Sequence, residues 1–390
     1  MPSNNILDAE LRRETNRSRF ASSLRPEYIR PTANELSRTL AAIIAEYDWD
    51  SLTPSDVNRL TAAIRSEFKT QWSGMWEDIN ESLIALGFIE AQQVQEVYED
   101  FTPDTLAAPT EKQVETTART SVMVLTTNEV TEGTWAQFMR QNTDRTAERV
   151  AAVIRESYRN NLTLQEMLQQ LRGRYDRRTR SYVGGVLNGR AVAGAEALAR
   201  TGVSHYANAA RDSFARANKD VIQERILFAT LDNRTTTVCM GRHLNRYPVE
   251  GDYPRLPFHY NERSQYIFKT KGFDPLNTDR PATGGQRGQQ AEEAFEARQE
   301  STSKKVRYRG RRDANIFDVE QISAKTSVDE WLRRQPRWFV ESTLGKERAR
   351  LFLDGNLKID RFTDMLGRQL TLDQLRETSA GERAFRRANQ

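Results

Sequence analysis

Three side chains with the chemistry of metal ligands or acid–base catalysts lie near one another in residues 224–261. They are Cys239, His243 and His259. A closed structural zinc site needs about four ligands, chiefly nitrogen and sulfur, and these three residues fall short of that number. We therefore expect no bound metal and no cofactor. Cys239 is then expected to be a small buried apolar residue, and the two histidines are expected to hydrogen-bond backbone groups around turns.

Motifs that mark common enzyme active sites are absent from the sequence. It has no glycine-rich phosphate loop with a lysine, no Gly-x-Ser-x-Gly and no His-Glu-x-x-His. With only His205, His243 and His259, few groups titrate near neutral pH. We predict that the chain is not an enzyme and has no catalytic residues. The alternative is a nuclease-like site in which His259 acts with Arg234 or Glu250, and this site needs a base, an acid and a cation in one concave place.

Two clusters of basic residues are candidate contacts for nucleic acid, although the net charge of the chain is only +4. Binding to phosphates needs cationic side chains that follow a backbone, and it requires no reading of bases. The first cluster comprises Arg172, Arg174, Arg177, Arg178 and Arg180. The second, which we call the basic insertion, includes a tyrosine that could stack on a base, and it comprises Lys304, Lys305, Arg307, Tyr308, Arg309, Arg311 and Arg312. Either cluster could instead contact an acidic protein surface.

The stretch around these histidines is predicted to be a small β element in a helical chain. Turn residues separate its extended candidates, which are residues 226–229, 235–239 and 247–249. Long stretches with helical apolar stripes lie on both sides. We therefore predict a mainly α fold with a small β element (α+β), in an elongated multi-helix protein with a short sheet around residues 224–261.

Changes in composition divide the chain into seven predicted regions. They are a flexible N-terminal arm (1–31), an N-terminal helical region (32–110), a long-helix region (111–222), a small β core (223–270), a linker with the basic insertion (271–326), a small C-terminal helical region (327–378) and a tail (379–390). The single cysteine excludes an internal disulfide framework. No apolar run approaches the roughly 18 residues of a membrane span, so we expect no membrane partner.

The central stretch also resembles a known family through an ordered series of short motifs. The central motif positions are Thr230, Leu231, Asp232, Arg234, Thr235, Cys239, Pro257, His259 and Asn261. The flanking positions are Ala199, Arg200, Thr201, Trp331, Leu332, Gln335, Pro336, Gly345 and Arg348. In this order the residues resemble the phage head-morphogenesis family, the phage Mu protein F-like minor head proteins, between residues 195 and 375. Many members have further cysteines where this chain has Thr236, Glu262 and Ser264.

The resemblance implies a minor head (minor capsid) protein of a tailed bacteriophage that binds near the portal. It implies a role in head morphogenesis and in DNA packaging or ejection, in the virion near the portal vertex, with the host cytoplasm as the place of assembly. The implied partners are the portal protein, the major capsid protein and other head or neck proteins, with packaged DNA as a partner of the basic clusters. The alternatives are a nuclease-like enzyme centred on His259 and a free DNA-binding accessory protein. Under the resemblance, ten motif residues are structural: Arg200, Thr201, Asp232, Arg234, Cys239, Pro257, His259, Asn261, Trp331 and Pro336.

Overall fold

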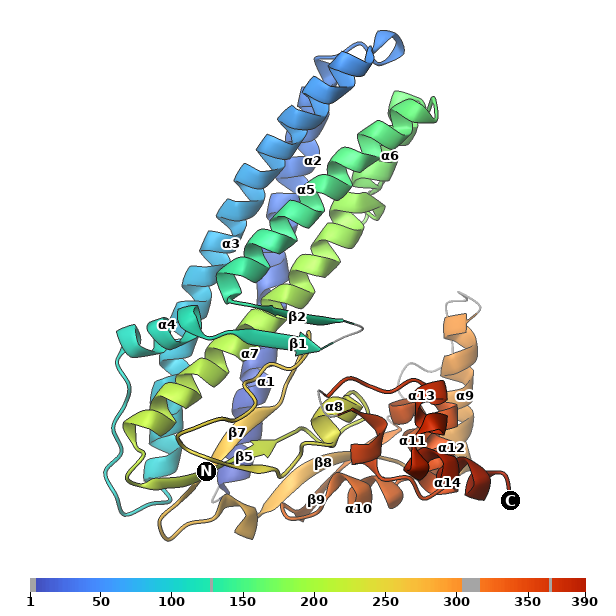
Figure 1. The fold of residues 1–390 in the computed structure, drawn as a ribbon. Helices are drawn as coiled ribbons and strands as arrows, with labels where there is room; N and C mark the ends of the chain where they lie inside the picture. The colour runs from blue at the N-terminus through green and yellow to red at the C-terminus, as the bar shows by residue number, and fades with distance from the viewer. Residues whose placement is uncertain (1–4, 127–128, 304–315, 365–366) are drawn as a thin grey trace.

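The computed structural model describes residues 5–126, 129–303, 316–364 and 367–390. A long bundle of helices stands on a smaller base, which contains a three-stranded sheet and the C-terminal helices (Figure 1). Helices dominate, and the strands form only small antiparallel sheets. The predicted fold, a mainly α and elongated protein with a small β element, is confirmed.

The bundle consists of helices that run side by side and bury their apolar faces against one another. The longest, α3, has 46 residues and is therefore about 70 Å long. The bundle helices are α1 (Ile6–Leu24), α2 (Arg30–Ala45), α3 (Pro54–Glu99), α5 (Trp135–Arg159), α6 (Leu164–Arg172) and α7 (Val192–Ala217). Two short π-helical turns lead into these helices: η1 (Arg25–Ile29) precedes α2, and η3 (Val186–Ala191) precedes α7. A short helix, α4 (Glu111–Thr120), packs on α3 and α7.

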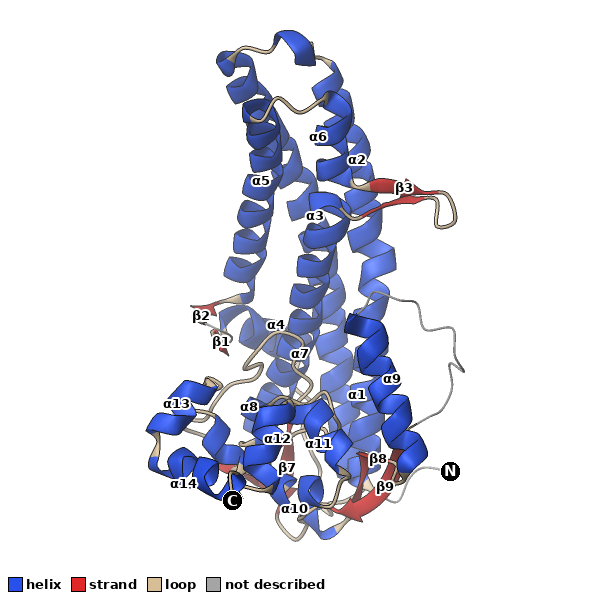
Figure 2. Cartoon of the chain, turned by 90° about the vertical axis from the view of Figure 1, so that its right-hand side faces the viewer, coloured by secondary structure: helices blue, strands red, loops and turns tan. Residues whose placement is uncertain are grey.

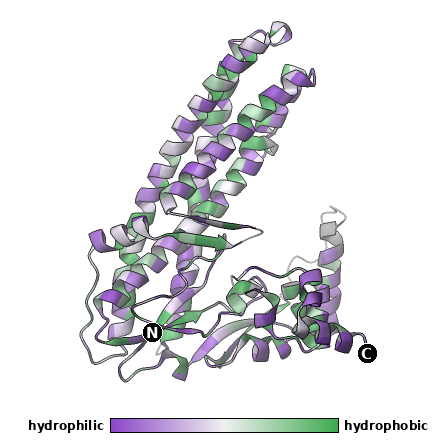
Figure 3. Ribbon diagram, in the orientation of Figure 1, coloured by the Kyte–Doolittle hydropathy of each residue, from purple (hydrophilic) through white to green (hydrophobic). Residues whose placement is uncertain are grey.

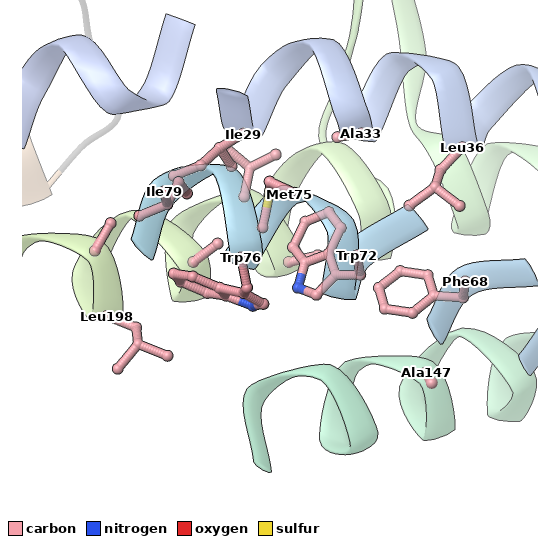
Figure 4. Packing of buried hydrophobic residues seen from close by; sticks show 14 of the residues in the cluster. Ile29, Ala33, Leu36, Phe68, Trp72, Met75, Trp76, Ile79, Ala147 and Leu198 are labelled. Atoms are coloured by element: carbon pink, nitrogen blue, oxygen red, sulfur yellow. The ribbon is translucent and has the colours of Figure 1, made fainter. Parts of the chain in front are cut away.

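Large aromatic side chains fill the core of the bundle (Figure 4). Trp72 is fully buried and stacks on Phe68 with their ring centroids 5.0 Å apart. Trp76 meets the edge of Trp135 with a centroid distance of 5.9 Å. A Cβ atom on Gly202 of α7 would lie only 2.5 Å from the Trp135 ring. The close contact between α7 and α5 therefore requires a residue without a side chain at this position.

Two short hairpins extend from the bundle. The first pairs β1 (Met123–Thr126) with β2 (Val130–Gly133), next to the start of α5. The second, which we call the basic hairpin, pairs β3 (Arg174–Asp176) with β4 (Ser181–Val183) and projects from the side of the bundle (Figure 2). It leaves Arg174, Arg177, Arg178 and Arg180 exposed.

The predicted flexible arm at residues 1–31 is wrong for the part that the structure describes. Residues 6–24 form α1, whose Ile6 and Leu7 are fully buried in the same apolar cluster as the central sheet. Part of the buried face of α1 is charged, because Glu10, Arg13 and Arg17 have little exposed surface. A pattern of charges suggests a solvated segment, and here the charges are instead paired inside the protein.

These charges form what we call the buried charge network, where α1, α3, α7 and the central sheet meet. Glu90 of α3 accepts hydrogen bonds from Arg13 Nη2 at 2.5 Å, Arg17 Nη1 at 2.6 Å and Arg211 Nε at 3.0 Å. Glu10 pairs with Arg211 of α7. Because burying a charge without a partner is very unfavourable, the network fixes the position of α1 against the bundle.

The base is organised around the sheet β6–β5–β7, which is antiparallel throughout. Its strands are β5 (Ile222–Phe228), β6 (Arg246–Pro248) and β7 (Gln265–Thr270). The predicted strands at residues 226–229 and 247–249 overlap β5 and β6. The extended segment predicted at residues 235–239 is wrong, since residues 237–240 form the short helix α8 (Thr237–Met240). The Thr236 side chain accepts a hydrogen bond from the Cys239 N–H and so caps α8.

The linker predicted at residues 271–326 is also wrong in part. It contains an antiparallel pair of strands, β8 (Asp279–Gly285) and β9 (Phe317–Ser323), and the helix α9 (Gln289–Ser303). β8 is rich in glycine because a Cβ atom on Gly285 would lie 2.6 Å from the Trp338 ring. Close packing, and not flexibility, therefore accounts for this glycine.

The C-terminal helices cover β8 and form a third apolar cluster. They are α10 (Val328–Arg333), α11 (Arg337–Leu344), α12 (Lys346–Leu353), α13 (Leu372–Glu377) and α14 (Ser379–Ala388). The tail predicted at residues 379–390 is wrong, because α14 buries Ala384 in this cluster. Polar and apolar residues alternate along the helices (Figure 3). Within the described residues, no helix has the length and apolar character needed to cross a membrane.

Candidate functional site

The candidate site lies where α8 meets the loop that precedes β7. α8 supplies Cys239, and its N-cap is Thr236. The loop supplies His259 and Glu262. Cys239 and Glu262 are buried, whereas the His259 side chain keeps 15 % of its surface exposed.

The side chains of this cluster are in direct contact. Cys239 Sγ lies 3.1 Å from His259 Nε2 and 2.8 Å from Glu262 Oε1. Thr236 Oγ1 lies 2.9 Å from the same His259 nitrogen. The thiol, imidazole and carboxylate offer three ligand atoms within 4.8 Å of one another, a set that could hold a metal ion.

The hydrogen bonds of His259 determine which ring nitrogen faces the cluster. Nδ1 lies 2.9 Å from the carbonyl oxygen of Tyr260, which can only accept, so in the neutral ring Nδ1 carries the proton. Nε2 therefore presents its lone pair to Cys239 and Thr236. Burial, and then the neighbouring carboxylate of Glu262, raise the pKa of the Cys239 thiol well above its usual range. Without a metal, the neutral thiol donates its hydrogen bond to Glu262.

The composition of this cluster differs from the set considered in the sequence. His243 is elsewhere in the base, where Nδ1 accepts the N–H of Ala229 at 3.2 Å and Nε2 lies 3.3 Å from Arg280. The expectations of a buried Cys239 and of histidines that bond the backbone are confirmed. Glu262 was missed because only cysteine and histidine were counted as ligands. Its position, at which many members of the resembled family have a cysteine, was the signal that could have identified it.

A second set of motif residues holds the loops around the cluster. Asp232 accepts two hydrogen bonds from Arg263, at 2.7 and 2.8 Å, and a third from the backbone N–H of Arg234. Bidentate pairs of this kind fix geometry strongly. The Arg234 side chain is 76 % exposed, and its Nε lies 3.8 Å from Asp232 Oδ2, so it also forms an ion pair with Asp232. Asp232 thus acts on the loop conformation, and most of the Arg234 side chain remains in contact with solvent.

Motif residues on α7 are joined to the same loop. The Thr201 hydroxyl accepts the N–H of Asn261 at 3.2 Å, and Asn261 adopts a left-handed φ of 60°, which asparagine tolerates well. Arg200 pairs with Glu196 one turn earlier. Two further motif residues lie outside the cluster, since Trp331 is in the core of the C-terminal helices and Pro336 precedes α11.

A cleft of about 820 Å³ separates this cluster from the C-terminal helices. Thr236 and His259 line the cleft together with Arg234, Arg348 and Arg368. Asp364 also lines it and forms an ion pair with Arg368 at 2.7 Å, so the lining keeps an excess of positive charge. Such a lining suits an anionic ligand. Glu250, the other partner considered for a nuclease-like site, forms an ion pair with Lys219 and does not line this cleft.

The two basic clusters differ in what the structure says of them. Four arginines of the first cluster lie on the exposed basic hairpin, and the fifth, Arg172, ends α6 with its guanidinium 4.5 Å from the centre of the Tyr182 ring. The basic insertion, Lys304 to Arg312, lies outside the described residues. Comparison with protein-family models, with curated proteins and with solved structures found no match to this chain.

Proposed function

We propose that this chain is a minor head protein of a tailed bacteriophage, bound near the portal and acting in head morphogenesis. The observation that best supports this proposal is the convergence of motif residues from separate segments. Cys239 meets His259, and Thr201 meets Asn261, through direct contacts in one small region. Short motifs that match by chance have no reason to contact one another, so their convergence favours the resemblance.

The shape of the molecule is consistent with an assembly role. The long bundle and the base offer separate surfaces, so one could hold the portal protein while the other reaches the major capsid protein or other head or neck proteins (Figure 1). The basic hairpin offers a surface for packaged DNA, because its cations are exposed and phosphate binding requires no more specific geometry. The proposed location is the phage head near the portal vertex, reached from the host cytoplasm during assembly.

The experiment that tests this proposal locates the chain in particles. A host strain that makes the chain with a C-terminal peptide tag is used to prepare phage particles, and the tag is found by electron microscopy with a tag-specific antibody fragment. We expect the label at a single vertex. If the chain is absent from the preparation, or if its label covers the shell evenly, the proposal is wrong.

A nuclease-like enzyme is the second candidate, and the position of His259 at the edge of the cationic cleft is the observation that favours it. The purified chain and its His259→Ala variant are incubated with DNA and RNA in the presence of divalent cations. For a head protein, neither preparation cuts. Cleavage by the wild-type chain that is lost in His259→Ala would replace the head-protein proposal with an enzymatic one.

A further inference from the structure

We propose that Cys239, His259 and Glu262 bind one divalent metal ion of the zinc class, with a fourth coordination position open to the cleft. The site does not depend on the function proposed above, because it would serve a head protein, an enzyme or a DNA-binding protein equally. It replaces the expectation of no metal, which counted nitrogen and sulfur ligands alone. The ligand set is a thiolate, an imidazole and a carboxylate, all of which zinc accepts.

The surroundings of Glu262 are the first argument for a cation. Its carboxylate is fully buried, and in the described part of the chain the basic side chain beside it is His259, whose neutral ring places an unprotonated Nε2 3.9 Å from Oε2. Glu90 is buried to a similar degree and contacts three arginines. A buried carboxylate is costly without a compensating charge, and a thiol is only a weak hydrogen-bond donor. A divalent ion would supply the missing positive charge.

The spacing of the ligand atoms is the second argument. Bond lengths of about 2.3 Å to sulfur and about 2.1 Å to nitrogen or oxygen place tetrahedral ligands about 3.4 to 3.6 Å apart. Here Sγ of Cys239 lies 3.1 Å from Nε2 of His259 and 2.8 Å from Oε1 of Glu262. Nε2 lies 3.9 Å from the second Glu262 oxygen. One ligand atom from each of the three residues lies within 4.8 Å of the other two, so side-chain rotations that change the separations by about 1 Å would bring them to zinc-binding distances.

The hydrogen bonds around the ligands are the third argument, because they hold two ligands in position before any ion arrives. His259 Nδ1 donates to the carbonyl oxygen of Tyr260, which leaves Nε2 free to coordinate. Glu262 Oε2 accepts the backbone N–H of Phe258 at 2.5 Å. Supports of this kind orient metal ligands and strengthen binding.

The charge balance and the open position follow from the same geometry. On binding, the Cys239 thiol releases its proton to solvent, and the thiolate and carboxylate together neutralise the 2+ charge of the ion. Thr236 and His259 border the cleft, so the fourth position would take the Thr236 hydroxyl or a water molecule from the cleft. The ion would join α8 to the loop before β7, two segments that no disulfide links in this chain with its single cysteine.

The test is a titration of the full-length chain, freed of metal by a chelator, with zinc sulfate in competition with a chromogenic chelator. We expect one equivalent to bind, and we expect Cys239→Ser and Glu262→Gln each to weaken binding at least about 10-fold. The control is Glu250→Gln, an exposed carboxylate of the same region that forms an ion pair with Lys219, which should bind as the wild-type chain does. Cobalt in place of zinc should give a thiolate-to-metal charge-transfer band that Cys239→Ser lacks.

Three results would each refute the metal site. Absence of stoichiometric zinc, or equal zinc affinity in the wild-type chain, Cys239→Ser and Glu262→Gln, would show that the cluster is only a hydrogen-bonded group. If the variants of the buried residues fail to fold, His259→Asn provides the test, because His259 is partly exposed and its loss should weaken zinc binding while circular dichroism stays unchanged. Unchanged binding in a folded His259→Asn would also refute the site.

Discussion

Replacing Glu90 with glutamine should destabilise the protein by about 3 to 5 kcal/mol at neutral pH. Burial raises the pKa of Glu90, but the guanidinium groups of Arg13, Arg17 and Arg211 outweigh burial and lower the pKa to about 2. A carboxyl group whose pKa falls from 4.5 to about 2 on folding contributes about 3 kcal/mol. Removing one partner of a buried ion pair generally costs about 3 to 5 kcal/mol, since it leaves the other charges unpaired.

The contribution of Glu90 also has a defined pH dependence. Because the pKa of Glu90 is lower in the folded chain, its contribution is complete above pH 4.5 and is lost as the pH falls toward 2. The difference in stability between the wild-type chain and Glu90→Gln should therefore be constant near neutral pH. It should narrow below pH 4.5, where the wild-type carboxylate takes up its proton on unfolding.

Urea unfolding followed by tryptophan fluorescence measures this difference, because Trp72, Trp76 and Trp135 report on the bundle core. The control is Glu81→Gln, an exposed residue of the same helix, which should change stability by less than about 0.5 kcal/mol. A loss below about 1 kcal/mol in Glu90→Gln would mean that the network contributes little to stability. A difference that does not narrow in acid would mean that Glu90 is not the titrating group.

Three further predictions concern other parts of the molecule. In urea unfolding, Gly202→Ala should lower the free energy of unfolding by about 1 to 3 kcal/mol, because its Cβ meets the Trp135 ring. The control is Gly74→Ala on α3, which has open space around it and should raise the free energy of unfolding by up to about 1 kcal/mol. No change in Gly202→Ala would contradict the packing argument. Burial lowers the pKa of His205 from 6.5 to about 4 on folding, so protons favour the unfolded chain. The stability of the wild-type chain should therefore fall as the pH falls from 6.5 to about 4, and the stability of His205→Gln should fall less. Serine in place of Arg177, Arg178 and Arg180 of the basic hairpin should leave the melting temperature unchanged and reduce the slope of log DNA affinity against log salt by about 0.9 per lost contact. An unchanged slope would mean that DNA binds elsewhere on the chain.

The sequence predicts the helical class, because apolar residues recur with the helical period. It predicts the position of β5 from a short run of β-branched and aromatic residues bounded by turn residues. It fails for α1, where three of the seven buried residues are charged and pair with residues far along the chain. It fails for β8, where glycines that permit close packing have the composition of a linker. Distant pairing and close approach are properties of the folded chain, and local composition does not reveal them.

The candidate site also combines residues that the sequence identifies with residues that only the folded chain brings together. Cys239 and His259 are conspicuous in the sequence because their residue types are rare in it, with one cysteine and three histidines in the chain. Glu262 is one acidic residue among many, and in the structure its burial beside Cys239 distinguishes it. The cationic lining of the cleft also depends on tertiary structure, because Arg348 reaches it from α12 and Arg368 reaches it from the loop before α13.

The buried charge network has a consequence for the order in which the chain folds during translation. Glu10 of α1 hydrogen-bonds Gln265 of β7, a residue 255 positions later. At about 5 to 20 residues per second, about 13 to 50 s separate the synthesis of these two residues. During that interval Arg13 and Arg17 can pair with Glu90, but α1 has no sheet to pack on. The bundle, with α1 packed on it, should therefore fold first on the ribosome, and the base should fold only after β7 emerges.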